Sequence, residues 1–162
     1  MAKNMFGTSS QTRLKELHPD LQLVMNETLD IMDISIAVGF RTKEAQQAAY
    51  ASGNSKVQWP NSKHNQQPSL AVDVYPCVFG IKALMGTPDQ ITQIMTMFKC
   101  NKQQANDYVL KEIYAMQKII KGVANRHNIR IVWGGDWDND GNIYNNSFND
   151  LGHFELKGAT NG

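Results

Sequence analysis

Apolar residues recur every three or four positions in three long segments of the chain. These stripes cover residues 21–32, 91–98 and 109–123. A proline precedes each of the first two, at Pro19 and Pro88, where its missing N–H group would have no intrahelical partner anyway. The spacing predicts three amphipathic helices. A shorter helix is expected between Thr42, a good N-cap, and Gly53, a good C-terminal stop.

Four other segments have the character of strands. They are residues 34–40, where apolar and small side chains alternate, LAVDVY (70–75), IRIVW (129–133) and HFEL (153–156). Helices and strands in this order predict an α+β fold, with a small, mainly antiparallel sheet flanked by helices. The length suits a single domain over residues 1–162, because 162 residues can bury one sizeable core and not comfortably two.

Composition narrows the classes of function. The formal charge is +1, from 16 basic and 15 acidic residues, which disfavours nucleic-acid binding. The N-terminal segment lacks the apolar core of a signal peptide, and there is no apolar run of about 18 residues, so we expect synthesis in the cytoplasm. The cysteines, Cys77 and Cys100, are too few for a disulfide framework and lack CxxC spacing.

The strand LAVDVY carries a carboxylate in an otherwise apolar run. Strand periodicity puts Asp73 on the face opposite Val72 and Val74. If the valines face the core, Asp73 faces either solvent or a cleft. A solvated aspartate is the commoner arrangement, so the choice depends on which side chains share that face.

Histidines supply suitable neighbours. His153 opens the last strand in the same manner, with Phe154 on the opposite face, and His64 lies in the loop that leads to Asp73. Two imidazoles and one carboxylate, with a fourth position left for water, form a common catalytic zinc site. His18 and His127 lie at predicted helix ends and are interpreted as structural. The spacing alone leaves a zinc site and a solvated sheet face as alternatives.

An ordered set of motifs changes this balance. TRLKELHPDLQLVM, VGFRTKEAQQAAYASGNSK, SKH, AVD, WGGDW and HFEL follow one another over most of the chain. This series resembles the zinc D,D-carboxypeptidase and L-alanyl-D-glutamate endopeptidase family, which includes the vancomycin-resistance dipeptidases, and most closely its phage endolysin branch. The resemblance implies a fold of the Hedgehog and D,D-peptidase type. One departure is a spacer between His64 and Asp73 that is about two residues longer, with Pro68 where the family tends to have glycine.

The resemblance also implies roles for individual residues. It implies that His64, Asp73 and His153 hold zinc and that Asp150 acts as the catalytic acid–base, although an aspartate beside glycine is also a common turn residue. Arg41, at a strand-to-helix corner, is implied to bind substrate, and its guanidinium suits a carboxylate or oxyanion. The alternative for Arg41 is a surface ion pair of little energetic value.

Two tryptophans bracket the GGD segment of WGGDW. Trp133 and Trp137 are both candidates for a wall of the substrate cleft. Trp133 suits the hydrophobic core equally well, because it ends the apolar run IRIVW. We therefore assign only Trp137 to the cleft.

The expected function is that of a phage endolysin that hydrolyses peptidoglycan stem peptides, at the L-Ala–D-Glu bond. A D-Ala-D-Ala carboxypeptidase is the first alternative, since its ligands and base would be identical. A non-catalytic cell-wall or zinc-binding module is the second, and Asp150 argues against it. We expect a monomer without a separate cell-wall-binding domain. With no signal peptide, it would reach the wall only after a holin-type partner permeabilises the membrane.

The segment after WGG suggests a second metal. In DWDNDGNIYNNS, Asp136, Asp138, Asp140 and Asn142 stand at the first, third, fifth and seventh positions of an EF-hand-type calcium loop. Ser147 then occupies the twelfth position, where a bidentate glutamate belongs. The alternative is a turn whose aspartate side chains cap their own backbone.

Overall fold

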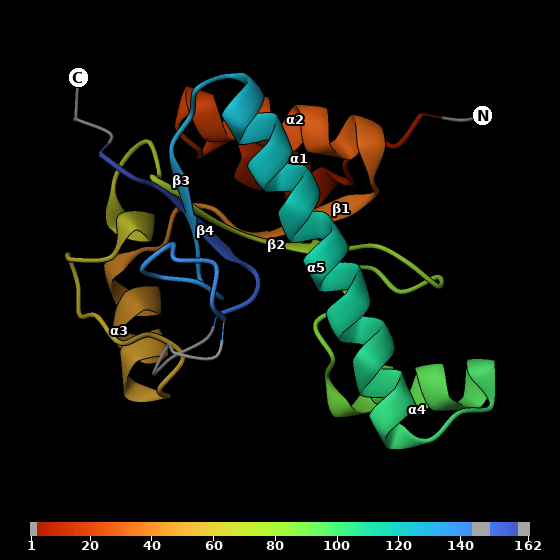
Figure 1. Cartoon of the computed structure of the whole chain (residues 1–162). Coiled ribbons are helices and arrows are strands. Elements are labelled where there is room, and N and C mark those ends of the chain that lie inside the picture. Colours follow the sequence, from red (N-terminus) through yellow and green to blue (C-terminus); the bar gives the residue numbers. More distant parts are fainter. Residues whose placement is uncertain (1–2, 144–149, 159–162) are drawn as a thin grey trace.

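A four-stranded antiparallel sheet organises the described part of the chain, residues 3–143 and 150–158 of a computed structural model. The strand order is β1-β2-β4-β3, so the two central strands are far apart in sequence. Helices flank this sheet (Figure 1), and the α+β fold expected from the sequence is confirmed. The elements are α1 Thr8–Lys15, α2 Pro19–Ile31, β1 Ile34–Val38, α3 Lys43–Ala51, η1 (a 3₁₀ helix) Lys63–Asn65, β2 Ala71–Pro76, α4 Pro88–Phe98, α5 Lys102–Arg126, β3 Ile131–Trp133 and β4 His153–Leu156.

Helix ends follow the sequence signals. Thr42 caps α3 through a bond from the backbone N–H of Ala45, and Thr87 caps α4 with Gln90 completing a capping box. The expected long helix begins earlier than its apolar stripe because Asn101 caps α5 in the same way. Helix α1 is an element that the apolar pattern did not predict, because only Ser10 of its eight residues is buried.

The hydrophobic core lies between one face of the sheet and the long helix. Val72, Val74 and Phe154 are completely buried, and α5 crosses the sheet on this side (Figure 1). Trp133 also belongs to this core, which decides between the two positions that the sequence left open for it. None of the described helices is long and apolar enough to cross a membrane.

The opposite face of the sheet carries polar side chains. Asp73 of β2 and His153 of β4 are paired directly across the antiparallel ladder. Because side chains alternate along each strand, the register that buries Val72 and Phe154 turns Asp73 and His153 together onto the other face. Asp73 is only 8% exposed, so it is not a solvated aspartate, which is the commoner arrangement for this residue in a strand.

A bulge in β1 brings a third segment to this face. The pairing between β1 and β2 shifts between Ile36 and Val38, so Val38 lies opposite Asp73. Gly39 then packs against α1, where an added methyl group would lie 2.8 Å from both the carbonyl oxygen of Arg13 and a carboxylate oxygen of Glu16. The chain leaves the sheet here, and Arg41 stands at the corner before α3, as the sequence predicted.

Candidate metal centre and active site

Three ligand atoms converge on the polar face of the sheet. Nε2 of His64 lies 3.1 Å from Oδ1 of Asp73 and 3.2 Å from Nδ1 of His153, and the latter two atoms lie 3.0 Å apart. A tetrahedral zinc ion with bonds of about 2.0 Å holds its ligands about 3.3 Å apart. The triangle therefore has nearly the dimensions that a zinc ion requires, and the side chains chosen from the sequence are the ones that form it.

The outer nitrogen of each histidine is held by an acceptor. Nδ1 of His64 donates to the carbonyl oxygen of Gly39 at 2.7 Å, and Nε2 of His153 donates to Oε2 of Glu155 at 2.9 Å. A neutral imidazole that donates from one nitrogen presents a lone pair at the other. For both histidines that second nitrogen is the one in the triangle, which is the usual arrangement around a bound metal.

Local structure explains how His64 reaches the triangle. It lies in η1, where Ser62 caps the turn and the side chain of Asn65 accepts a bond from the backbone N–H of Ser62. His64 is almost completely buried despite its polar surroundings in the sequence. The long spacer after it leaves this geometry intact, because the Leu70 backbone N–H donates to the carbonyl oxygen of Lys63 and closes the loop onto the turn.

Asp73 and His153 shift each other's pKa in the metal-free site. Burial alone would raise the pKa of Asp73, but hydrogen bonds from His153 and His64 hold it well below its usual range. Burial would likewise lower the pKa of His153, whereas hydrogen bonds to Asp73 and Glu155 raise it to about 9. A bound metal ion would displace one proton from His153, because a histidine must be neutral to act as a metal ligand.

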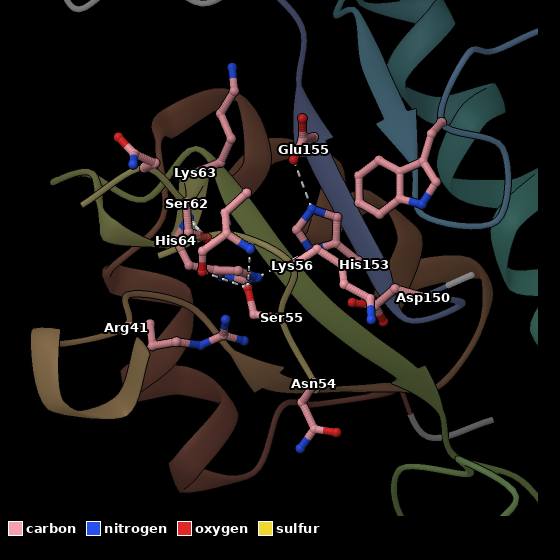
Figure 2. Close-up of a pocket in the computed structure, with 13 residues that line it drawn as sticks. Arg41, Asn54, Ser55, Lys56, Ser62, Lys63, His64, Asp150, His153 and Glu155 are labelled. Atoms are coloured by element: carbon pink, nitrogen blue, oxygen red, sulfur yellow. Dashed lines mark hydrogen bonds and ion pairs between the residues drawn. The ribbon is translucent and has the colours of Figure 1, made fainter. Parts of the chain in front are cut away.

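A pocket of about 440 Å³ opens beside the triangle. Figure 2 shows His153 and Asp150 on one side of it and Arg41 extending towards its centre from another. Trp137 also lines the pocket, with its ring centroid 5.2 Å from that of His153. The structure thus brings together all the residues that the sequence proposed for zinc, catalysis and substrate, although they come from separate segments of the chain.

Asp150 and Arg41 bring opposite charges to this pocket. Burial and the charge of Asp73 raise the pKa of Asp150, a change in the direction that favours a general base. Nη2 of Arg41 lies 3.5 Å from Oδ2 of Asp73, and its side chain is only 16% exposed. Arg41 is therefore not the solvated surface arginine of the alternative interpretation.

The remaining histidines and the cysteines lie away from this pocket. His18 caps α2 by accepting from the backbone N–H of Asp20, and His127 lies 2.9 Å from a carboxylate oxygen of Glu27, so both are structural as predicted. Both cysteines are free.

The Asp-rich loop forms a cluster of its own. Carboxylate oxygens of Asp136, Asp138 and Asp140 lie within 4.8 Å of one another. Asp136 accepts backbone N–H groups from Asp140 at 3.1 Å and Gly141 at 2.9 Å, and the Asn142 N–H donates to Asp140 at 2.7 Å. These bonds are the turn contacts of the alternative interpretation. Ser147, the expected twelfth position, lies outside the described residues.

Two participants in the site were not predicted from the sequence. Glu155 shares a strand face with His153, so its period-two spacing could have identified it as the partner of that imidazole. Gln46 had no such signal, because it is one of two adjacent glutamines on a mostly exposed helix. Its side chain is nevertheless completely buried and accepts a hydrogen bond from Arg41.

Comparisons with known proteins identify the family and a shared fold. The family model described as phage L-alanyl-D-glutamate peptidase matches residues 2–104, a range that includes Arg41, His64 and Asp73. Among solved structures, the chain is similar to the crystal structure of the L-Ala D-Glu endopeptidase ChiX from Serratia marcescens. That likeness has a TM-score of 0.63 at 20% identity and covers 96% of this chain and 92% of the other, which shows a shared fold. No curated protein matches the chain.

Proposed function

Because the chain belongs to the phage L-alanyl-D-glutamate peptidase family, we propose that it is a zinc-dependent endolysin that cuts the L-Ala–D-Glu bond of peptidoglycan stem peptides. Family membership makes it a peptidoglycan hydrolase of this class. The proposal adds the metal, the residues that hold it and the residues that act on the substrate.

The observation that carries the proposal is the triangle of His64, Asp73 and His153. Two neutral nitrogens and one carboxylate oxygen suit zinc better than calcium or magnesium, which prefer oxygen ligands. The acceptors on the outer nitrogens, Gly39 and Glu155, orient both imidazoles towards one point. When bound there, zinc would supply a Lewis acid that activates water at neutral pH and polarises a carbonyl group.

Asp150 is the proton carrier in this proposal. It lines the same pocket as the two histidines, and burial together with the charge of Asp73 raises the pKa of its carboxyl group, which makes it a better proton acceptor than an exposed aspartate. Hydrolysis of an amide needs a group that takes a proton from water and gives one to the leaving amine. Asp150 can do both in turn, because a carboxylate accepts a proton and a carboxylic acid donates one.

Arg41 is the proposed substrate contact. The D-glutamyl residue carries a carboxylate outside the peptide backbone, and a guanidinium binds such a group through a rigid fork of donors. Arg41 reaches the pocket with one edge of its guanidinium near Asp73. Trp137 offers an aromatic wall beside His153 for apolar parts of the stem peptide.

Two other functions are less well supported. A D-Ala-D-Ala carboxypeptidase would use the same metal ligands and base, but the matching family is that of the L-alanyl-D-glutamate peptidases. A non-catalytic cell-wall or zinc-binding module would have no use for a proton-transferring carboxyl group such as Asp150 in the pocket beside the metal ligands.

The biological setting follows from the endolysin assignment. The proposed polymer substrate is bacterial peptidoglycan, reached from the host cytoplasm once a holin-type protein has permeabilised the membrane. The proposed active form is a monomer.

Calcium binding is a further part of the proposal. Asp136, Asp138 and Asp140 already cluster, and carboxylate oxygens at alternating positions suit a hard cation. Asn142 would add an oxygen ligand. In the sequence this loop comes shortly before Asp150, so a cation bound there would help to position the catalytic carboxylate.

Mass spectrometry of purified muropeptides, before and after digestion by zinc-loaded protein, tests the proposed function. New fragments with a free N-terminal D-glutamate are expected. Loss of the terminal D-alanine would instead identify a carboxypeptidase. Unchanged muropeptides, with zinc content verified, would overturn the peptidase assignment in either form.

A further inference from the structure

Gln46 is a completely buried amide in a polar part of the molecule. Its Oε1 accepts from Nη1 of Arg41 at 3.1 Å and from Nδ2 of Asn65 at 3.3 Å. Its Nε2 donates to Oγ of Ser55 at 2.9 Å and to the carbonyl oxygen of Val57 at 2.7 Å. A glutamine amide has two donor hydrogens and two acceptor lone pairs, and all four are used here.

The orientation of this amide is fixed by its partners. A guanidinium can only donate and a backbone carbonyl can only accept, so a rotated amide would place its NH₂ group against Arg41 and its oxygen against Val57. Both contacts would then be lost inside a buried site, where unmet polar groups are costly. Gln46 therefore holds its four partners in one arrangement.

The partners belong to different parts of the pocket. Arg41 is the proposed substrate contact, and Ser55 and Val57 line the pocket wall. Asn65 follows His64 in η1 and also donates to the carbonyl oxygen of Arg41 at 3.0 Å. The amide of Gln46 is thus hydrogen-bonded to Arg41, to the pocket wall and to the turn that carries His64.

Helix α3 depends on this side chain for its attachment. Within α3, all of which is described, Gln46 is the one buried residue. The helix contributes no residue to the main hydrophobic cluster, so a hydrogen-bonded amide takes the role that an apolar stripe usually has. Replacing Gln46 should consequently loosen the pocket while leaving the core of the protein intact.

We propose that Gln46 is a positioning residue, which fixes the guanidinium of Arg41 and the wall of residues 54–57 relative to the metal ligands. The proposal rests on the proposed function, in which Arg41 contacts the substrate. A long arginine side chain has many rotamers, and misplacement of a binding group by about 1 Å can reduce turnover by about 100-fold.

Gln46→Met tests the role, because methionine has a similar length but forms no comparable hydrogen bonds. Gln47→Met is the matched control, since Gln47 is the next residue on the same helix and is exposed. Gln46→Met should retain zinc and lose at least about tenfold in kcat/KM, while Gln47→Met should be unaffected. Normal kcat/KM in Gln46→Met, or loss of its zinc, would overturn the proposal.

A double-mutant cycle separates positioning from a general structural effect. If Gln46 acts through Arg41, adding Gln46→Met to Arg41→Ala should lower kcat/KM much less than it does in the wild-type background. Fully multiplicative effects in the cycle would contradict an action through Arg41.

Hydrogen exchange gives a readout that needs no substrate. The backbone N–H groups of Ser55 and Arg41 donate to the carbonyl oxygens of Ala49 and His64, and both bonds belong to segments that Gln46 ties together. Peptides covering residues 40–42 and 54–57 should exchange faster in zinc-loaded Gln46→Met than in Gln47→Met, with α5 unchanged. Equal exchange in the two variants would refute the positioning role. Because this result does not depend on peptidase activity, failure of the proposed function would be recognised separately.

Discussion

Gly134 lies directly against the backbone of Asp150. A methyl group on Gly134 would come within 2.1 Å of the Asp150 carbonyl oxygen. The Asp150 backbone N–H donates to the Gly134 carbonyl at 2.8 Å, and the Gly134 N–H donates to the carbonyl of His153 at 2.7 Å. The glycine that follows β3 thus holds the segment that carries both the proposed acid–base and a metal ligand. This contact gives the first glycine of WGGDW a physical function.

Gly134→Ala should therefore disable the enzyme. The backbone of Asp150 would have to move, and we expect a loss of at least about tenfold in kcat/KM, because small displacements at a reacting centre are costly. Gly122→Ala is the control, since Gly122 lies within α5 with no atom near its added methyl group. That variant should keep full activity and gain up to about 1 kcal/mol in unfolding free energy. Equal activity in the two variants would show that the contact does not position Asp150.

Replacement of any ligand should remove the metal. His64→Ala, Asp73→Ala and His153→Ala should each lose zinc, measured as the metal-to-protein ratio after dialysis, and should lose activity with it. His18→Ala is the control, because His18 only caps α2. A variant that retained one zinc ion per chain would exclude the replaced residue from the ligand set.

Asp150→Asn should separate chemistry from metal binding. The amide keeps the size of the carboxylate but can neither take nor give a proton, so we expect full zinc content and a loss of about 10²–10⁴-fold in kcat. Timed digestion of a synthetic stem peptide, quantified by chromatography, provides the rate. Near-normal turnover would assign the proton transfer to another group.

Glu155→Gln should weaken the metal site without removing a ligand. Glu155 accepts the hydrogen bond from Nε2 of His153, and loss of such an outer partner typically costs about 10–100-fold in metal affinity. Competition with a zinc chelator measures the change in dissociation constant. Glu112→Gln, at a half-buried position of α5 outside the pocket lining, is a suitable control. Unchanged zinc affinity in Glu155→Gln would mean that the contact does not support the ligand.

Calcium binding should show as heat in a titration of zinc-loaded protein. The expected result is one binding event that disappears in the double variant Asp138→Asn, Asp140→Asn, because both carboxylates would contribute oxygen ligands. Activity should fall when a calcium-selective chelator is added and return with calcium. No heat at millimolar calcium, together with unchanged activity, would reduce residues 136–142 to a turn.

Much of the fold could be predicted because its signals are local. Helical spacing, caps such as Thr42 and Thr87, and the strand segments around Asp73 and His153 each depend on a few neighbouring residues. Helix α1 could not be predicted in this way because its buried face is too small to make an apolar stripe. Strand β3 covers only Ile131–Trp133, since the sheet pairing, which is not local, ends there.

The candidate site divides in the same way. The sequence by itself determined which side chains could bind a metal, because ligand chemistry belongs to residue types, and their ordered motifs pointed to a family. Tertiary structure alone decided that Asp73 and His153 are paired across the sheet and that Glu155 and Gly39 orient the imidazoles. It also decided that Gln46, and not the adjacent Gln47, is buried beside Arg41. Register, burial and hydrogen-bond partners depend on contacts between segments far apart in the chain. No local pattern encodes which of two adjacent glutamines will be buried in such contacts.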